Sequence, residues 1–147
     1  MQVTTVTEID NVVFDTIYAA NSASIVENTG YNDIENLRQT FNNDQDNFYL
    51  FSFVKDGEVV GYVQGFGEGT TISVFNSVTK DGNVFAEAVT NSAAFLKSLG
   101  FTHLSVACTD GTPMHNWTKA DCSRPDLFKF EQEVLHETYT SVLIAIL

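Results

Sequence analysis

Basic residues are scarce in this sequence, with seven Lys and Arg against 19 Asp and Glu and a formal net charge of -12. A field of that sign repels the phosphates of nucleic acids and of anionic membranes, so direct binding to either is not expected. The charge favours a basic small molecule or a basic protein as partner, although solubility alone would also account for it.

Cysteine, signal sequences and long apolar runs are nearly or wholly missing. Cys108 and Cys122 are the two cysteines, and residues 1–10 carry neither a basic region nor an apolar run, so no signal peptide is expected. The longest apolar stretch, Val142–Leu147, is far too short to cross a bilayer. With both cysteines interpreted as reduced, we expect a soluble cytoplasmic protein.

Proline is also rare, with two in 147 residues, and no linker or internal repeat divides the chain. Apolar residues make up 44% of the sequence and include 12 Phe, which is enough for one hydrophobic core. We therefore expect residues 1–147 to form a single α/β domain.

Apolar residues that recur every three or four positions predict two helices near the N-terminus. Ile9, Val13 and Ile17 mark the first helix, and Thr7 is its expected cap. The second helix is expected to begin near Asp33, capped by Asn32.

The pattern then changes to one typical of strands. The segments Phe48–Val54, Glu58–Phe66 and Thr70–Val78 predict three strands, with Asp56 and Gly57 as a tight turn between the first two. Glycines at positions 65, 67 and 69 predict the second reversal. The simplest arrangement is an antiparallel meander, with residues 72, 74 and 76 on one face of its third strand.

A helix and another strand follow. Gly100 is a suitable residue to end the helix, and Thr102–Cys108 is expected to pair in parallel with the third strand through a right-handed crossover. A short helix is expected at Pro125. In the tail, Glu131–Leu147, apolar and polar residues alternate as in a strand. This pattern fits either a hairpin that turns at residues 136–138 or one long bent strand. The apolar stripe of the helix comprises Phe85, Ala88, Ser92, Phe95 and Leu99.

With a leading strand at Gln2–Val6, this order of elements resembles the GNAT superfamily of acyl-CoA-dependent N-acyltransferases. Val54–Tyr62 is similar to the second hairpin of that family, and Phe95–Phe101 followed by Leu104–Val106 is similar to the end of its central helix and the next strand. The resemblance covers most of the chain in element order. It implies an α/β fold with a mixed sheet, an antiparallel meander plus one parallel crossover, flanked by helices.

The resemblance also implies a place for acetyl-CoA. In the family, the third strand and its parallel neighbour diverge, the pantetheine arm lies between them, and the pyrophosphate contacts main-chain amides where the central helix begins. The matching cofactor-binding positions here are Lys80, Gly82, Asn83 and Val84. Asp81 departs from the family's pattern, because it places a carboxylate beside phosphates.

Transfer of an acyl group to an amine needs a base, and the resemblance implies Glu68 and Glu87 as candidates. The family often uses a tyrosine of its last helix to protonate the leaving thiolate. The matching segment, Leu127–Phe130, contains no tyrosine, so the acid stays unassigned.

Cysteine and histidine permit two other chemistries. Cys108, His115 and Cys122 are soft metal ligands, but their spacing matches no known zinc knuckle, so no metal is expected. Cys122 with His115 or His136 would be the components of a nucleophile pair, although sequence distance does not establish contact.

Two functions stay open. The first is a GNAT-like protein without the full catalytic motif, in a binding or assembly role, such as a component of a tailed-phage virion, with oligomerisation compatible with it. The alternative is an active acetyl-CoA-dependent N-acyltransferase acting on a basic amine. The incomplete phosphate loop favours the first, and the fold resemblance favours the second. Cofactor binding in either case depends on divergence of the strands at Thr70–Val78 and Thr102–Cys108.

Overall fold

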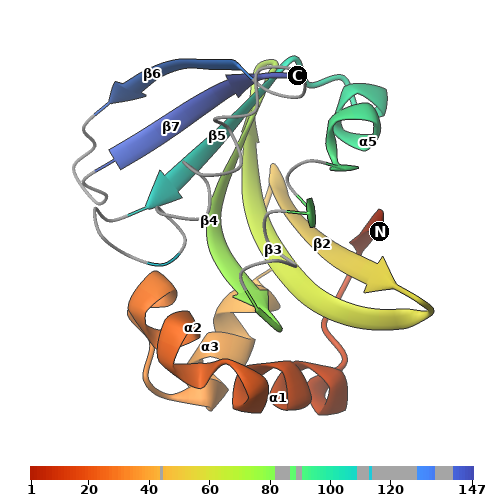
Figure 1. The fold of residues 1–147 in the computed structure, drawn as a ribbon, viewed down its shortest axis with the longest axis vertical. Helices are drawn as coiled ribbons and strands as arrows, with labels where there is room; N and C mark the ends of the chain where they lie inside the picture. Colours follow the sequence, from red (N-terminus) through yellow and green to blue (C-terminus); the bar gives the residue numbers. More distant parts are fainter. Residues whose placement is uncertain (44, 82–86, 89–90, 109–112, 114–128, 135–140) are drawn as a thin grey trace.

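A seven-stranded mixed sheet organises the chain, with strand order β1-β2-β3-β4-β5-β7-β6. The computed structural model describes residues 1–43, 45–81, 87–88, 91–108, 113, 129–134 and 141–147. Figure 1 shows α1, α2 and α3 gathered on one side of the sheet and α5 on the other. The strands are β1 (Gln2–Val6), β2 (Phe48–Lys55), β3 (Glu58–Glu68), β4 (Thr71–Thr79), β5 (His103–Cys108), β6 (Lys129–Val134) and β7 (Ser141–Ile146). The described helices are α1 (Asn11–Ala20), α2 (Ser22–Thr29), α3 (Ile34–Phe41) and α5 (Ala93–Ser98).

Strands β1 to β4 form the predicted antiparallel meander. Asp56 and Gly57 make the two-residue turn between β2 and β3 with φ of 53° and 80°, the left-handed conformation that such a turn requires. The second reversal is narrower than predicted and centres on Gly69, at φ 59°. Gly65 and Gly67 lie inside β3, where side chains of β2, β4 and the segment before β5 pack against them.

The N-terminal helices begin at residues other than those predicted. Asp10 caps α1, accepting hydrogen bonds from the main-chain N–H groups two and three residues later at 3.0 and 3.1 Å. The prediction of Thr7 as the cap is therefore wrong, because the carboxylate of Asp10 satisfies these N–H groups itself. Asp33 likewise caps α3 in place of Asn32. Helix α2 was not predicted, and its buried residue is Ile25.

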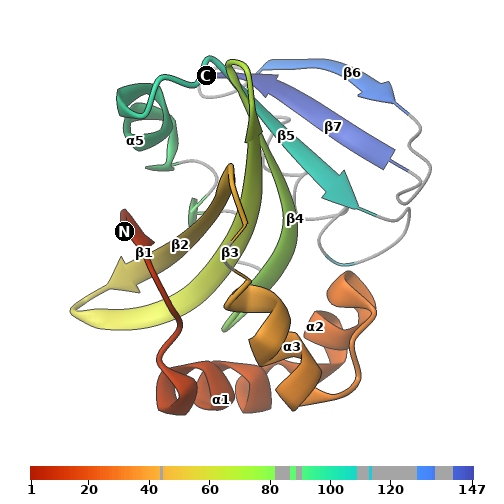
Figure 2. The ribbon, with the colours of Figure 1, turned by 180° about the vertical axis from the view of Figure 1, so that it is seen from behind.

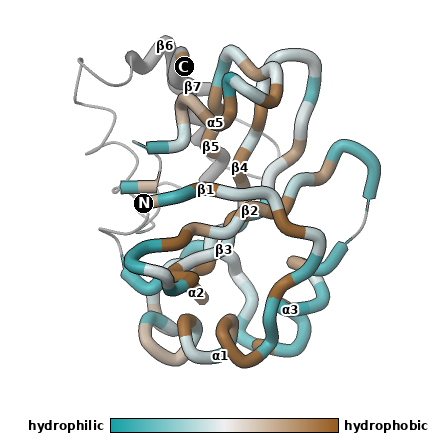
Figure 3. Tube along the Cα trace, turned by 90° about the vertical axis from the view of Figure 1, so that its right-hand side faces the viewer, coloured by the Kyte–Doolittle hydropathy of each residue, from teal (hydrophilic) through white to brown (hydrophobic). Residues whose placement is uncertain are grey.

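The two faces of the sheet carry separate cores. Figure 2 shows from behind the helices on either side of the sheet, α1 to α3 and α5. We call them the α1–α3 face and the α5 face. In Figure 3 the tube alternates between hydrophobic and hydrophilic segments along α1 and α3, as expected for helices with one buried side. The α1–α3 face buries Ile9, Phe14, Ile17, Ile25, Leu37, Phe41, Leu50, Tyr62 and Val78. The α5 face buries Val3, Phe51, Phe53, Val60, Val63, Ile72, Val74, Ala88, Leu96, Phe101, Leu104 and Val106.

Helix α5 ends as the sequence predicts. Gly100 has φ 95° and donates its N–H to Lys97 O at 3.0 Å, while Phe101 donates to Leu96 O at 3.2 Å. This pair of hydrogen bonds is the Schellman motif, which a glycine at this position favours. Leu99 is 39% exposed, so its assignment to the buried stripe is wrong. Residues 82–86 and 89–90 of the predicted helix lie outside the described residues.

The C-terminal tail is a hairpin, which decides between the two predicted alternatives. β6 and β7 pair antiparallel, and β7 lies between β6 and β5. The turn between them and the predicted helix at Pro125 lie outside the described residues. No helix in the described part of the chain has the length and apolar character needed to cross a membrane.

Candidate functional site

Strands β4 and β5 are parallel neighbours over a short distance only. Their pairing runs from Thr71–His103 to Val74–Val106 and then ends. Both strands continue, β4 alongside β3 to Thr79 and β5 alongside β7 to Cys108. Figure 1 shows the arrowheads of β4 and β5 pointing apart. The predicted divergence of these two strands is confirmed.

A β-bulge lies where the parallel pairing ends. Gln64 of β3 pairs with Asn76, and the next residue, Gly65, pairs with Val74, so Phe75 is an extra residue in β4. A bulge bends its strand and increases the local twist. The bulge at Phe75 therefore gives a local physical reason for β4 to leave its parallel neighbour at this point.

The bulge also changes which side chains of β4 share a face. Val74 belongs to the α5 face, whereas Val78 belongs to the α1–α3 face. On the second half of β4, Ser77 and Thr79 consequently project to the α5 face. Thr79 Cγ2 confirms this, since it lies 2.9 Å from where a Cβ on Gly61 would stand, beside Phe53 of that core.

In the second half of β4, the main-chain groups that do not bond to β3 point to the side on which β4 and β5 diverge. We call the space between the diverging strands the gap. Lys80 donates its N–H to Val60 O of β3 at 3.0 Å. Main-chain groups of successive residues point to opposite sides of a strand, so those of Ser77 and Thr79 point away from β3. The carbonyl of Thr79 does so, because it accepts a hydrogen bond from Asn21 Nδ2 at 3.0 Å. On the side away from β3, the Thr79 carbonyl is thus bonded to the segment between α1 and α2, and the main-chain groups of Ser77 are directed to the side on which β5 diverges.

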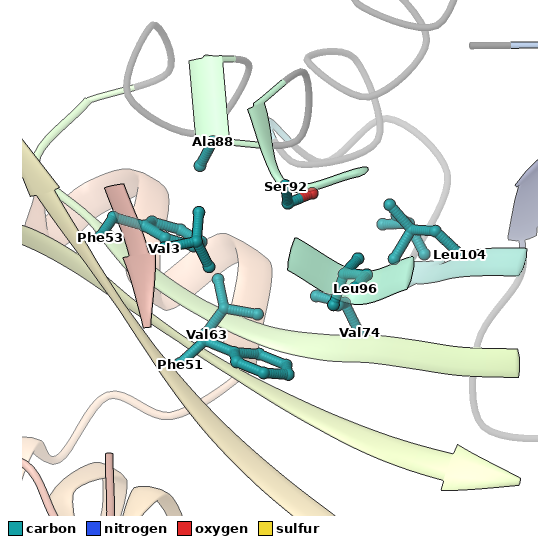
Figure 4. Close-up of a pocket in the computed structure, with 10 residues that line it drawn as sticks. Val3, Phe51, Phe53, Val63, Val74, Ala88, Ser92, Leu96 and Leu104 are labelled. Atoms are coloured by element: carbon teal, nitrogen blue, oxygen red, sulfur yellow. The ribbon is translucent and has the colours of Figure 1, made fainter. Parts of the chain in front are cut away.

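The hydroxyl of Ser77 is buried, with 1% of the residue exposed, and its Oγ has no hydrogen-bond partner among the described residues. Ser77 pairs with Val63 of β3. Val63, Ala88 and Leu96 are among the residues that line an apolar cavity of ≈ 30 Å³. Figure 4 shows these side chains converging from the sheet and from the segment before β5. A buried hydroxyl without a partner costs about 1–3 kcal/mol, so Ser77 marks a place where the fold gives up stability.

A buried amide relay occupies the α1–α3 face beside the same gap. Gln64 Nε2 donates to Thr40 O at 2.9 Å, and Asn76 Nδ2 donates to Gln64 Oε1 at 3.1 Å. A main-chain carbonyl can only accept, so Thr40 fixes the orientation of both amides. The Oδ1 of Asn76 is therefore turned away from Gln64. The sequence gives no signal for this role, because the bulge reverses the predicted face of Asn76.

The predicted cofactor-binding residues are described in part. Lys80 follows β4 directly, is exposed, and lines a groove of ≈ 480 Å³ between α1 and the β2–β3 turn. Asp81 is exposed beside it. Gly82, Asn83 and Val84 lie outside the described residues, so their role stays a prediction.

The two candidate bases lie toward opposite ends of β4. Glu87 Oε2 is 2.8 Å from Lys55 Nζ, and this hydrogen-bonded ion pair raises the pKa of Lys55 above its ordinary value. Lys55 ends β2 and pairs with Glu58 at the start of β3, the strand that separates β2 from β4. Glu68 is exposed and pairs with Thr71 at the start of β4, roughly 26 Å along the strand from Thr79. The structure therefore brings neither glutamate to the bulge.

The other predicted chemistry falls mostly outside the described residues. Cys108 ends β5, whereas His115, Cys122 and His136 are not described. Within the described ranges, no three His, Cys, Asp or Glu side chains form a group that could hold a metal ion. Lys129 and Phe130, where the family's tyrosine was sought, belong to β6.

Comparison with known proteins relates this geometry to solved structures. No protein-family model matches the sequence, and no curated protein matches it either. Aminoglycoside acetyltransferase AAC(6')-Ib in complex with coenzyme A is similar, at 12% identity and a TM-score of 0.67, over 97% of this chain and 94% of that one. The GNAT domain of S. lividans PAT is 14% identical, with a TM-score of 0.65 over 99% of this chain and 89% of that one.

A third similar structure is ribosomal-protein-alanine N-acetyltransferase from Brucella melitensis, at 14% identity and a TM-score of 0.59. It is matched over 100% of this chain and 99% of that one. Identities this low establish the fold and leave the activity open. The mixed sheet, the diverging parallel pair and these similarities together show that this chain has the GNAT acetyltransferase fold.

Proposed function

We propose that this chain is an acyl-CoA-dependent N-acyltransferase that holds acetyl-CoA between β4 and β5. The end of parallel pairing at Val74–Val106 carries the proposal, because β4 continues beyond it with the main-chain groups of Ser77 directed away from β3. The pantetheine arm contains two amides, and amides pair with an open strand edge as another strand would. The unpartnered hydroxyl of Ser77 is a further polar group that a ligand in this position would satisfy.

One positively charged residue is placed where it could bind the phosphates of acetyl-CoA. The chain as a whole is strongly acidic, which opposes an anionic cofactor. Lys80 is exposed at the end of β4, and main-chain amides at Gly82, Asn83 and Val84 are the predicted partners of the pyrophosphate. Bound acetyl-CoA would supply an acyl group already activated as a thioester.

The acceptor that suits this chain is a primary amine on a basic molecule. A net charge of -12 attracts cations. A further similar structure, aminoglycoside acetyltransferase AAC(6')-Ib, was solved in complex with coenzyme A and kanamycin. The Oδ1 of Asn76 can accept a hydrogen bond from the amine N–H, which orients the nitrogen lone pair. The nitrogen forms the C–N bond as the C–S bond breaks, the amine's proton passes to water, and the thiolate of CoA is protonated by solvent.

The first experiment is a thermal-shift titration with acetyl-CoA. A ligand that binds only the folded state must raise the melting temperature. ATP, which has the phosphates but no pantetheine arm, is the matched control and should give little shift. No shift at millimolar acetyl-CoA would contradict the proposal.

A second candidate is a GNAT-fold protein that binds CoA without catalysis, in a binding or assembly role that includes a virion component. The observation in its favour is that Glu87 is paired with Lys55 and Glu68 lies at the far end of β4. Release of free thiol from acetyl-CoA, followed with a chromogenic disulfide and a panel of primary amines, separates the two. Cofactor binding without amine-dependent thiol release would favour the non-catalytic role.

A further inference from the structure

Three phenylalanine rings form a cluster outside both buried cores of the sheet. The ring centroids of Phe48 and Phe66 are 5.5 Å apart and those of Phe48 and Phe75 are 5.8 Å apart, both pairs in edge-to-face contact. All three side chains are only half-buried, and none belongs to either core. We call these three residues the phenylalanine patch. Apolar side chains that stay together yet partly open to solvent are typical of a binding surface.

The alternation of side chains along β3 places the patch on the α1–α3 face. A Cβ at Gly67 would lie 2.9 Å from Tyr49 and 3.1 Å from Phe101, which belongs to the core of the α5 face. Gly67 therefore faces α5, and its two neighbours, Phe66 and Glu68, face the other way. Glu68 is exposed. A carboxylate thus stands on the same face as the patch, one side-chain step beyond Phe66.

Asn76 lies on this face at the other end of the patch. Its amide bonds to Gln64, which pairs with it across β3 and β4. Phe75, the extra residue of the bulge, is the direct neighbour of Asn76, and its contact with Phe48 places its ring on the same face. From Gln64 to Glu68 the strand rises by roughly 13 Å. The face therefore presents an amide, apolar rings and a carboxylate in that order.

This order of groups matches a linear diamine. The methylene groups of such a molecule lose contact with water when they lie on aromatic rings, and an ammonium group is attracted both to a carboxylate and to a ring face. The net charge of -12 attracts a dication more strongly than a single cation. An acceptor with one amine would leave Glu68 unused, and an anionic acceptor would be repelled by it.

We propose that Glu68 and the phenylalanine patch determine specificity for a long linear diamine. Its distal ammonium pairs with Glu68, its methylene chain lies on the patch, and its other amine reaches Asn76. That this second amine is the one acylated rests on the proposed function. Glu68 is then a binding residue and not the base. The site selects for chain length, because a short diamine that reaches Asn76 cannot also reach Glu68.

The test compares 1,8-diaminooctane with n-octylamine, which has the same number of carbons and one ammonium group. NMR titration of the isotope-labelled protein gives both Kd values and should show the amide signals of Phe66 and Glu68 moving. Wild type should bind the diamine about three to five times more tightly. Glu68→Gln should abolish this preference. Glu58→Gln, the same change at the other end of β3, is the matched control and should keep it.

Two further measurements separate the chain from the charge. Phe66→Ala removes apolar surface that both ligands contact, so it should raise both Kd values by a similar factor and keep the preference for the diamine. 1,3-Diaminopropane is too short to span the patch and should bind wild type more weakly than the longer diamine.

Each outcome supports or overturns the assignment. Equal Kd values of the two eight-carbon ligands for wild type, an unchanged preference in Glu68→Gln, or no saturable binding of the diamine would overturn it. If acetyl-CoA still raises the melting temperature in that case, the proposed function stands without this site. Diamine binding that depends on Glu68, in a protein that does not bind acetyl-CoA, would keep the site and overturn the proposed function.

Discussion

At the scale of residues, Asn76 and Ser77 are consecutive in β4 and serve opposite faces of the sheet beside the same gap. Asn76 belongs to the amide relay on the α1–α3 face, and Ser77 projects to the α5 face. A cofactor arm in contact with Ser77 would pass through the gap toward Asn76. The proposal therefore brings the thioester at the end of the arm to the side of β4 on which Asn76 holds the amine.

The amide relay gives a prediction about stability. Asn76→Ala leaves Gln64 Oε1 buried without its donor, and this should lower the free energy of unfolding by about 1–3 kcal/mol. Urea denaturation measures the loss, with Asn36→Ala on the exposed surface of α3 as the control. A loss no greater than that of Asn36→Ala would show that the relay contributes nothing to the fold.

Gly61 gives a second residue-scale prediction. A Cβ at this position would lie 2.9 Å from Thr79 Cγ2 and 3.3 Å from Thr79 Cα, so Gly61→Ala should destabilise the protein by about 1–3 kcal/mol. Thr79→Ser removes the closer methyl group. The double variant should therefore lose less stability than the sum of the two single variants, and simple additivity in denaturation experiments would contradict the steric explanation.

The ion pair between Lys55 and Glu87 gives a prediction about pH. The hydrogen bond and charge of Glu87 raise the pKa of Lys55 above 10.5, so the pair stabilises the fold below that pH and is lost as the pH rises through the raised pKa. Both side chains are partly exposed, so the effect is small. Lys55→Gln should melt slightly below wild type at neutral pH, and the difference should disappear in strong alkali. Lys97→Gln is the control, and a difference independent of pH would exclude the ion pair as its cause.

Residue roles at the gap could not be predicted from the sequence. Strict alternation assigned residues 72, 74 and 76 to one face, and Ile72 and Val74 do share the α5 face. Asn76 lies on the other face, because the extra residue Phe75 shifts the register by one. No residue type marks a bulge of this kind, since Phe75 is an ordinary strand former.

At the scale of elements, the turn and the helix C-terminus that require positive φ were predicted correctly. The Asp56–Gly57 turn and the Gly100 helix end both need positive φ, and the structure has both. Helix α2 was missed because it is short, has a single buried residue at Ile25, and follows α1 after one residue. The crossover from β4 to β5 was predicted from element order, and its early end was implied by the family resemblance.

The cap of α1 gives the element-scale prediction. Asp10→Ala removes the carboxylate that accepts two main-chain hydrogen bonds, and it should cost about 0.5–2 kcal/mol of stability. Asp10→Asn keeps an accepting oxygen and should recover most of the loss. If Thr7→Ala were the more damaging substitution in the same denaturation assay, the assignment of the cap to Asp10 would be wrong.

At the scale of the whole molecule, one sheet connects the N-terminal strand to the C-terminal hairpin through every strand between them. We therefore propose that residues 1–147 fold as one unit. The sheet is continuous at one end of the β4–β5 pair and open at the other. This asymmetry lets the second half of β4 extend beyond its parallel neighbour within one continuous sheet.

Amide hydrogen exchange with and without saturating acetyl-CoA tests most directly whether the open half of β4 holds the cofactor arm. We predict exchange at least about tenfold slower at Ser77 in the presence of acetyl-CoA, and no change at Ile72, which β5 already covers. An unchanged rate at Ser77 when the protein is saturated, or a rate at Ser77 already as slow as at Ile72 in the free protein, would contradict the account.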